Sequence, residues 1–315
     1  MKDHIAVLIP CFNEVHAIAN VVRDMSEAIP GCNVYVYDNN STDGTAQAAR
    51  TAGAVVRFEH MQGKGNVLRR MFREVDADCY VMIDGDGTYP AEAARELVRL
   101  VLEEGAEMAV GDRLEGNYDE ANKRPFHSFG NRLMRLIAKI CFDCNVPDML
   151  TGLRAFSPLF VKTFPALSDG FELETEMTMH ALDKRMRIMS IPIEYRERCA
   201  GSVSKLNTIR DGIRVIGVAL RLIKNYRPMR FFGAMALASL TIALILFIPV
   251  FSVYLDTGLV PRIPTLITSV AFGIVGAICL SNGISLENLA NFERRQFEIH
   301  LNMFTSMIFD RDKSK

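Results

Sequence analysis

Two aspartates that directly follow a short apolar run carry the clearest chemical signal in the sequence. Residues 79–83 are followed by Asp84, Gly85, Asp86 and Gly87. In extended backbone, residues two positions apart face the same way, so both carboxylates can address one hard cation such as Mg²⁺ or Mn²⁺. The glycines let a diphosphate approach the backbone, and a metal would offset the charge of a leaving group. An acidic turn that merely closes a strand–helix unit is the alternative, and the position after a buried strand favours the metal site.

Two glycine-containing segments imitate nucleotide-binding motifs. Gly85 and Gly87 resemble the start of a dinucleotide fingerprint, but Pro90 occupies the position of its third glycine. Lys64 lies between two glycines, yet Phe58 stands where a P-loop requires its first glycine. These departures disfavour an NAD-linked oxidoreductase and a P-loop nucleotidase, while Lys64 remains able to contact a phosphate.

Short β-rich runs alternate with helical stretches in the first part of the chain. The runs are residues 4–9, 33–37, 54–59, 79–83 and 107–110. This alternation predicts an α/β fold with a mainly parallel sheet and helices on both faces. Ligands of such sheets bind at the carboxyl ends of strands, so the candidate site comprises residues 10–14, 38–43, 84–88 and 111–113. Asp38 can accept hydrogen bonds from a nucleobase there, whereas Asp43 fits equally well as a helix N-cap.

The C-terminal part of the chain is apolar enough for lipid. Residues 231–255 and 263–286 are uncharged and long enough to span a bilayer, and the chain as a whole is 49% hydrophobic with a mean hydropathy of +0.12. The short turn between them predicts a transmembrane hairpin with both ends on one side. Basic residues flank those ends and place that side in the cytoplasm: Lys224, Arg227, Arg230, Arg294 and Arg295.

The segment before this hairpin predicts an amphipathic helix. Apolar residues from Ile209 to Ile223 recur at spacings of three and four beside a stripe that includes Arg214 and Arg221. Such a helix suits the membrane interface, and packing against the α/β core is the alternative. We therefore expect an α/β catalytic domain over residues 1–206, an interfacial helix over 207–230, the hairpin over 231–286 and a cytoplasmic tail over 287–315.

These features together predict an integral membrane protein with its catalytic domain on the cytoplasmic face, in the plasma or inner membrane if the source is prokaryotic. The formal net charge of −1 gives no indication of nucleic-acid binding. Whether the chain forms homo-oligomers is left open.

The motifs together resemble glycosyltransferase family 2 with the GT-A fold, in a branch similar to the polyprenyl-phosphate glycosyltransferases, relatives of dolichol-phosphate mannose synthase. The resemblance extends from residue 7 to about residue 205 and rests on the order and spacing of its segments. The matching segments are residues 9–14, 38–45, 63–65, 84–86, 111–113, 130–132, 148–156 and 204–206.

This resemblance implies an inverting transfer of a sugar from a nucleotide sugar to a polyprenyl phosphate in the membrane. It implies donor contacts from Pro10, Phe12, Glu14, Asp38, Asn40, Lys64, Asp84, Gly85 and Arg113. Asp86 would be the principal ligand of Mg²⁺ or Mn²⁺, with Asp84 and Thr88 as further ligands. Thr88 stands where family members often carry a glutamine. Arg132 and Lys205 would face the incoming phosphate and complete the catalytic set with Asp86.

Several alternatives stay open at this level. UDP-glucose, UDP-N-acetylglucosamine and GDP-mannose all suit the framework, and the resemblance favours a UDP-sugar. The acceptor can be undecaprenyl or dolichyl phosphate. A non-catalytic membrane module that binds nucleotide sugars is a further alternative, whereas a processive polysaccharide synthase is excluded because its Q-x-x-R-W motif needs a tryptophan and the chain has none.

Three glutamates and two histidines complete the candidates. Glu172, Glu174 and Glu176 open a predicted helix, where a stabilising interaction with the helix dipole and a donor-sugar role for one of them are equal alternatives. His127 and His180 have no partner that the sequence reveals, so both are expected to be structural.

Overall fold

The computed structural model describes residues 3–113, 125–144, 148–166, 173–194 and 208–313, with the side chains of 125–132, 208–216 and 304–313 left out. The chain divides into two compact units, Met1–Val215 and Ile216–Lys315.

The first unit is built on a mixed sheet whose described strands run in the order β3-β2-β1-β4-β6-β5-β7. Their bounds are β1 Ile5–Cys11, β2 Asn33–Asp38, β3 Val55–Phe58, β4 Cys79–Met82, β5 Met108–Asp112, β6 Arg154–Phe156 and β7 Ile188–Pro192. Among these strands all pairings are parallel except those of β6, which is antiparallel to both β4 and β5. The predicted mainly parallel α/β sheet is confirmed.

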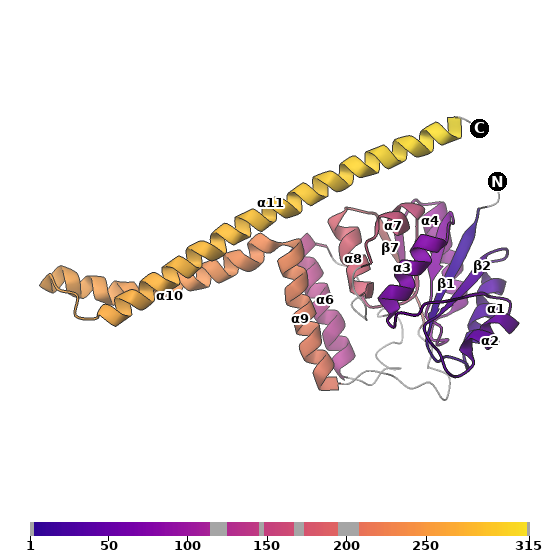
Figure 1. Ribbon diagram of the computed structural model, residues 1–315, viewed down its shortest axis with the longest axis horizontal. Coiled ribbons are helices and arrows are strands. Elements are labelled where there is room, and N and C mark those ends of the chain that lie inside the picture. The colour runs from indigo at the N-terminus through magenta and orange to yellow at the C-terminus, as the bar shows by residue number, and fades with distance from the viewer. Residues whose placement is uncertain (1–2, 114–124, 145–147, 167–172, 195–207, 314–315) are drawn as a thin grey trace. The chain divides into compact units, whose positions relative to one another are not determined.

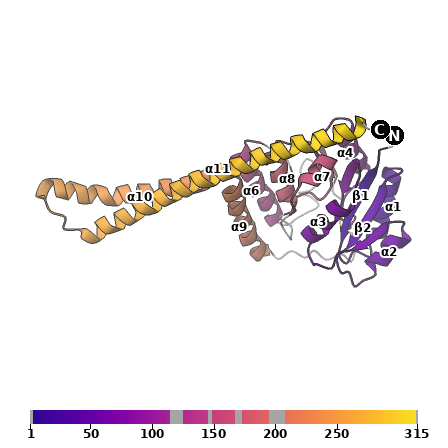
Figure 2. The ribbon, with the colours of Figure 1, turned by 45° about the horizontal axis from the view of Figure 1, so that its top comes forward.

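Helices cover both faces of the sheet (Figure 1 and Figure 2). One core packs α1 (Ile18–Ala28), α2 (Thr45–Thr51) and α4 (Ala91–Leu102) against the face that carries Val7 and Ile9 of β1. The other core packs α3 (Lys64–Glu74), α7 (Pro158–Thr163) and α8 (Leu173–Asp183) against the face that carries Ala6 and Leu8. This alternation along β1 follows from the twofold repeat of side chains in a strand. The unit also contains α6 (Pro125–Phe142), while α9 (Thr208–Tyr226) crosses the division between the units.

The strand order reverses between β1 and β4. From β1 the chain moves through β2 to β3 on one side, and β4 then pairs with β1 on its other side. Register pairs Cys11 with Asp38 and Leu8 with Met82, so the three strands end at one edge of the sheet. This edge is the position at which open α/β sheets bind their ligands.

Two strands were not predicted from the sequence. β6 has three residues, all buried, and so short a run shows no periodicity. β7 is an edge strand that ends at Pro192, a residue that an edge tolerates. Pro10 was expected to follow the first strand but lies within β1, because pairing with β2 continues to Cys11.

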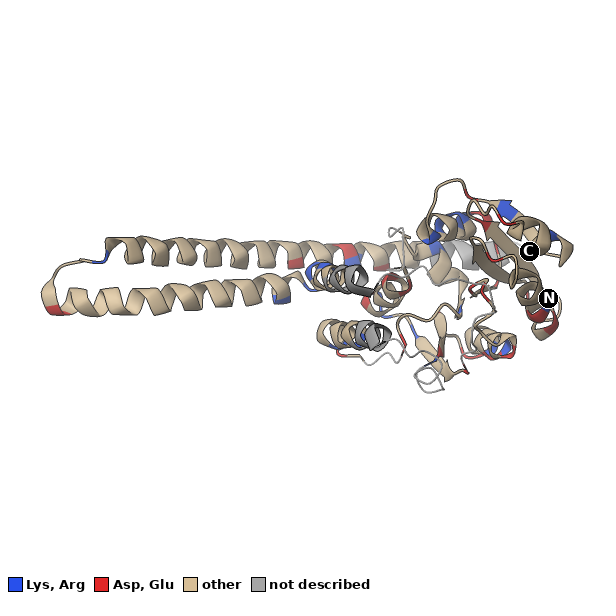
Figure 3. Cartoon of the chain, turned by 90° about the horizontal axis from the view of Figure 1, so that it is seen from below, with Lys and Arg blue, Asp and Glu red and all other residues tan. Residues whose placement is uncertain are grey.

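The second unit contains α10 (Pro228–Thr257) and α11 (Ile263–Lys313), which form an antiparallel hairpin. Gly258 ends α10 in the left-handed conformation, as is common at helix C-termini. Both helices are long and apolar enough to cross a membrane, and Figure 3 shows them nearly free of charge over most of the hairpin. Only 22% and 17% of their most apolar stretches are buried, unlike core helices of soluble domains. α11 continues as helix through residues that were expected to form a separate tail.

Hydrogen bonds between side chain and backbone join the two helices. Ser239 donates to the carbonyl of Phe272 at 2.7 Å, and Ser269 donates to the carbonyl of Ala243 at 2.8 Å. At the base of the hairpin, Glu287 accepts a hydrogen bond from the N–H of Met229. These contacts satisfy polar groups that lipid could not.

Candidate active site

The turn after β4 brings Asp86 and Thr88 together. Oδ1 of Asp86 accepts hydrogen bonds from the hydroxyl of Thr88 at 2.7 Å and from its backbone N–H at 3.2 Å. Gly87 between them adopts a φ of 74°, a conformation that glycine adopts without strain. Both side chains are buried, so this turn holds a preformed set of oxygen atoms at the carboxyl end of β4.

Lys64 lies at the centre of an ion cluster, called here the Lys64–Asp84 cluster. The Lys64 ammonium is 2.7 Å from Oδ1 of Asp84 and 2.5 Å from Oε1 of Glu174. Burial disfavours the charged form of Lys64, but the two carboxylates outweigh burial and hold the pKa of Lys64 above its ordinary value. Lys64 is therefore a permanent cation between two anions.

The residues of this edge fit a divalent metal that is shared with a substrate. Carboxylate and hydroxyl oxygens of Asp84, Asp86 and Thr88 suit Mg²⁺ or Mn²⁺. In the described part of the chain no three His, Cys, Asp or Glu residues cluster as a metal site. Mg²⁺ commonly binds one or two carboxylates and completes its shell with phosphate oxygens and water. Two carboxylates and a hydroxyl would leave positions in the metal's shell that oxygens of a diphosphate or water can fill.

Asp38, at the end of β2, is buried and incompletely hydrogen-bonded. Its Oδ2 accepts the N–H of Ser41 at 3.2 Å, whereas Oδ1 is buried without a partner among the described residues. A buried acceptor of this kind is costly unless a ligand satisfies it. An N–H of a nucleobase or an O–H of a ribose would do so, as expected from the sequence.

The loops after β1 and β2 are joined by hydrogen bonds. The N–H of Glu14 donates to Thr45 at 2.9 Å, and that of Val15 donates to Asp43 at 3.1 Å. Asp43 also accepts the N–H of Thr45 at 3.0 Å, while Gly44 is the N-cap of α2. Asp43 thus fixes the loop that contains Glu14 as well as the start of α2, but the predicted N-cap position is wrong, because Gly44 occupies it.

Pro10, Phe12 and Gly85 lie where β1 meets the turn after β4. Pro10 is the second-last residue of β1, and Phe12 directly follows that strand. A Cβ atom at Gly85 would lie 2.6 Å from Sγ of Cys11, so only glycine lets the two segments approach this closely.

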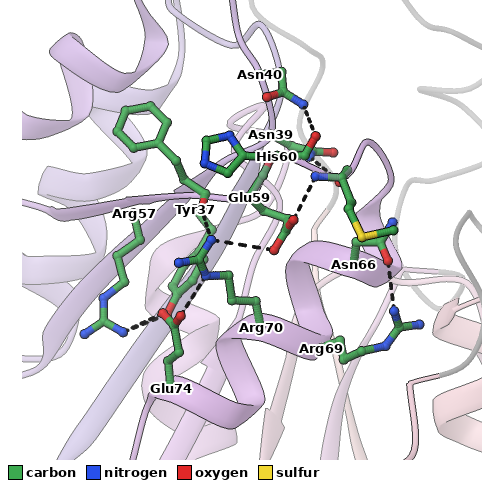
Figure 4. Close-up of polar contacts among 12 residues, drawn as sticks. Tyr37, Asn39, Asn40, Arg57, Glu59, His60, Asn66, Arg69, Arg70 and Glu74 are labelled. Atoms are coloured by element: carbon green, nitrogen blue, oxygen red, sulfur yellow. Dashed lines mark hydrogen bonds and ion pairs between the residues drawn. The ribbon is translucent and has the colours of Figure 1, made fainter.

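Asn39 anchors the loop that leads into Lys64; it lies in the predicted site segment 38–43 but was not singled out there. Its side-chain amide donates to the carbonyls of Glu59 and Met61 at 2.9 and 2.8 Å, and its Oδ1 accepts the N–H of Gly63 at 2.7 Å. Figure 4 shows this network between the end of β2 and the start of α3. The asparagine is 4% exposed. Its position in the segment 38–43, directly after the second predicted strand, was the sequence signal for it.

Asn40 lies in the same network at the surface. Its amide donates to the carbonyl of His60 at 3.0 Å (Figure 4). It also donates to Oε1 of Gln62 at 3.3 Å. Asn40 thus lies beside residues 60–62, and among the described residues no hydrogen bond joins it to the Lys64–Asp84 cluster. Its predicted contact with the sugar donor stays a prediction.

Arg113 forms a buried ion pair instead of an open basic group. Its Nε is 2.7 Å from Oδ2 of Asp148, and its guanidinium also reaches the hydroxyl of Tyr89 at 3.4 Å. The same hydroxyl accepts the N–H of Gly152 at 2.7 Å. Arg113 thus helps fix the segment around Gly152, whose backbone lies against the carboxylate of Asp84. A direct contact of Arg113 with the donor diphosphate stays a prediction.

Arg154 is a wholly buried arginine that was not singled out as a site residue. It donates to the carbonyls of Thr151 and Met149 at 3.0 and 2.8 Å and to the hydroxyl of Thr178 at 2.8 Å. Burial lowers the pKa of Arg154 to about 10, which leaves it charged at neutral pH. It joins the segment before β6 to the first turns of α8.

Two predicted catalytic residues lie outside what the structure describes. The side chain of Arg132, in α6, and the whole of Lys205 are among the undescribed parts, as is the side chain of His127. His180 is buried against Phe160 and Phe164, with ring centroids 5.8 and 5.4 Å away. Burial lowers the pKa of His180 to about 4, so the ring is neutral, in keeping with a structural residue.

Comparison with known proteins supports these observations. A family model described as Glycosyl transferase family 2 matches residues 6–162. The chain is 33% identical over 238 residues to Glycosyltransferase AglJ of Haloferax volcanii, covering 75% of this chain and 78% of that protein. It is 26% identical over 226 residues to the undecaprenyl-phosphate mannosyltransferase of Micrococcus luteus, covering 68% and 92%.

A solved structure of glucosyl-3-phosphoglycerate synthase from Mycobacterium tuberculosis, in complex with Mn²⁺, UDP-glucose and phosphoglyceric acid, superposes with a TM-score of 0.56. The sequence identity is 21%, and the match covers 71% of this chain and 79% of that one. The likeness confirms the expected GT-A fold. The family model and the AglJ relative identify the chain as a glycosyltransferase that belongs to family 2.

Proposed function

We propose that this enzyme transfers a sugar from a nucleotide sugar, most simply a UDP-sugar such as UDP-glucose or UDP-N-acetylglucosamine, to a polyprenyl phosphate. The observation that carries the proposal is the cluster at the β1–β4 edge. There, Asp84, Asp86 and Lys64 offer sites for a metal and a diphosphate at the same sheet edge as Asp38, whose Oδ1 has no hydrogen-bond partner among the described residues. The apolar α10–α11 hairpin supports an acceptor that comes from the membrane.

The relatives support the same acceptor class. The Micrococcus luteus protein is named for an undecaprenyl phosphate substrate, and its match covers 92% of that protein. An acceptor phosphate monoester is largely ionised near neutral pH, so its oxygen is already a nucleophile and no strong general base is needed.

The proposed reaction is one displacement at the anomeric carbon. A phosphate oxygen of the lipid forms the new bond to that carbon as the bond to the nucleoside diphosphate breaks, and the configuration inverts. Asp38 would hold the base or ribose, Lys64 would face the diphosphate, and Arg132 with Lys205 would bind the incoming phosphate. A bound Mg²⁺ or Mn²⁺ would stabilise the negative charge that the leaving diphosphate develops.

The test uses the full-length protein in lipid nanodiscs with either undecaprenyl or dolichyl phosphate. Labelled UDP-glucose, UDP-N-acetylglucosamine and GDP-mannose are supplied in turn with Mg²⁺ or Mn²⁺, and the label is counted in the lipid extract. We expect metal-dependent transfer from one donor, lost in Asp86→Ala and retained in Asp256→Ala, an exposed aspartate at the end of α10. Failure of every donor, or full activity of Asp86→Ala, would contradict the proposal.

GDP-mannose is the second candidate donor. The name of the Micrococcus luteus relative favours it, and the carboxylate of Asp38 can accept N–H groups from guanine as well as from uracil. In the same assay, label transferred from GDP-mannose alone would replace the UDP-sugar assignment without changing the reaction class.

We further propose that residues 1–206 lie in the cytoplasm, that residues 207–230 follow the membrane interface, that the hairpin over 231–286 spans the membrane and that residues 287–315 return to the cytoplasm. The support is the basic residues at both ends of the hairpin, including Arg230 and Arg295. An epitope inserted after Gly258 should bind an external antibody on spheroplasts, whereas one added after Lys315 should require permeabilised cells. The reverse pattern would overturn the assignment.

A further inference from the structure

Glu174 joins the candidate site from a distant part of the chain. It lies in the first turn of α8, and its Oε1 is 2.5 Å from Nζ of Lys64, which precedes it by 110 residues. Its side chain is 6% exposed. The sequence left open whether one of Glu172, Glu174 and Glu176 has a donor-sugar role. Glu172 lies outside the described residues, and the structure brings Glu174 to the Lys64–Asp84 cluster.

The backbone around Glu174 is itself held in place. The hydroxyl of Thr178 donates to the carbonyl of Glu174 at 3.0 Å and accepts a hydrogen bond from the buried guanidinium of Arg154 at 2.8 Å. A buried carboxylate needs a partner to offset its lost hydration, and for Glu174 that partner is Lys64. The carboxylate is therefore a fixed anchor for the lysine.

Lys64 requires such an anchor because its stem is flexible. The backbone is fixed just before it, where Gly63 donates to Asn39, but four rotatable side-chain bonds separate that point from the ammonium. An ammonium has three donors. Glu174 and Asp84 each accept a hydrogen bond from it, and the described residues provide no third acceptor. One N–H group of the ammonium is therefore available to a ligand.

Asp84 cannot hold Lys64 in place by itself during the reaction. Under the proposed function, Asp84 shares its carboxylate with the donor or its metal, whereas Glu174 reaches the cluster through Lys64. We propose that Glu174 is a positioning residue that keeps the Lys64 ammonium directed at the donor diphosphate. This inference rests on the proposed function and adds a residue that acts through Lys64.

A double-mutant cycle tests the proposal. Wild type, Glu174→Gln, Lys64→Met and the double variant are each titrated with UDP and, in parallel, with GDP in the presence of Mn²⁺ by calorimetry. We expect Glu174→Gln to weaken binding of the nucleotide that wild type binds by about tenfold, and to change it less than about twofold in the Lys64→Met background.

Thermal unfolding of the same four proteins gives a readout that does not depend on the donor. Lys64→Met leaves Glu174 as a buried carboxylate without its cation, so its melting temperature should fall. Adding Glu174→Gln should restore part of that loss. Glu92→Gln is the matched control, because Glu92 is also in the first turn of a helix but is exposed, and it should match wild type in binding and stability.

Two results would overturn the proposal. If Glu174→Gln leaves nucleotide affinity unchanged, Glu174 does not position a binding group. If it weakens affinity equally with and without Lys64, Glu174 acts by a route other than Lys64. If Glu174→Gln does not fold, Glu174→Asp replaces it in the cycle, because the shorter carboxylate keeps the charge but withdraws from Lys64; the same coupling is expected.

The outcome is separable from that of the proposed function. If wild type transfers sugar to lipid phosphate but the cycle shows no coupling, only the role of Glu174 is wrong. If wild type binds neither UDP nor GDP and transfers no sugar, the proposed function itself is wrong, and the positioning role, which rests on it, is wrong with it.

Discussion

The backbone of Gly152 packs directly against the carboxylate of Asp84. A Cβ atom at position 152 would lie 2.1 Å from Oδ2 and 2.7 Å from Cγ of Asp84, far inside van der Waals contact. The N–H of Gly152 is fixed by the hydroxyl of Tyr89 at 2.7 Å, and the other side of the carboxylate faces Lys64. The carboxylate of Asp84 is therefore held between the backbone of Gly152 and the ammonium of Lys64.

Replacing Gly152 by alanine should displace the carboxylate of Asp84 and lower the activity of the enzyme. We expect kcat/KM for the sugar donor to fall by about 100-fold or more, because small displacements of groups that position a substrate have effects of that size. Gly273→Ala is the control, since a Cβ there has nothing within 4 Å. Normal kcat/KM in Gly152→Ala would show that the position of Asp84 is not critical, and circular dichroism would establish that the variant is folded.

The sequence predicted the parts of this site that follow parallel strands. Asp38, Asp84 and Asp86 are each within four residues of a strand end, and the structure brings all three to one edge. A strand end can be recognised locally, because an apolar run gives way to polar residues. The topological rule then predicts where those residues meet.

The remaining contacts of the site could not be predicted because they depend on tertiary pairing. Glu174 meets Lys64 across 110 residues, and β6, which lies between β4 and β5, has three residues. Arg113 was expected to contact the sugar donor, and its pairing with the buried Asp148 was not predicted. Nothing local in the sequence distinguishes a buried arginine with a partner from one that faces solvent.

Asn39 should hold residues 59–63, the loop before Lys64, in a fixed conformation. Asn39→Asp places a carboxylate against the carbonyls of Glu59 and Met61, so two hydrogen bonds become repulsive contacts while the bond from Gly63 remains. We expect the donor KM to rise about tenfold and the free energy of unfolding to fall by about 2 kcal/mol. Steady-state kinetics and thermal unfolding measure the two effects.

The control for that variant is Asn20→Asp. Asn20 is exposed on α1 and accepts a hydrogen bond from Arg23, which an aspartate preserves. It should leave both the donor KM and the stability unchanged. An Asn39→Asp enzyme with an unchanged donor KM would show that the loop is not held by this residue.

The hydroxyl of Thr88 should tune how tightly the metal binds. Thr88→Val keeps the volume but removes the 2.7 Å hydrogen bond to Oδ1 of Asp86, which leaves the carboxylate less well oriented. Loss of a hydrogen bond to a charged group predicts that the Mn²⁺ concentration for half-maximal activity rises about tenfold. Thr51→Val is the control, because that hydroxyl donates within α2 at the surface. An unchanged Mn²⁺ requirement would place the metal away from Asp86.

His180 should make the enzyme less stable in mild acid. The pKa of His180 in the folded protein is about 4, below the ordinary value of 6.5 that applies to the unfolded chain. Between these two values the unfolded chain binds a proton that the folded protein does not bind. Stability should be unaffected above pH 6.5 and fall progressively towards pH 4, by about 2–3 kcal/mol in total. Unfolding of wild type and His180→Phe at pH 7.5, 6 and 5 tests this. Parallel losses in the two proteins would assign the acid sensitivity to other groups.

Close helix packing in the hairpin should depend on Gly276. A Cβ there would lie 2.8 Å from Cγ of Leu240 and 3.4 Å from the carbonyl oxygen of Ala236, whereas Gly273, three residues earlier on α11, has nothing within 4 Å. Gly276→Leu should separate the helices and weaken the neighbouring Ser239–Phe272 hydrogen bond, since overpacking at such contacts costs about 1–3 kcal/mol. We expect the melting temperature in detergent to fall by roughly 4 °C or more for Gly276→Leu and to stay unchanged for Gly273→Leu. Equal effects at both positions would mean that Gly276 does not mark the contact between α10 and α11.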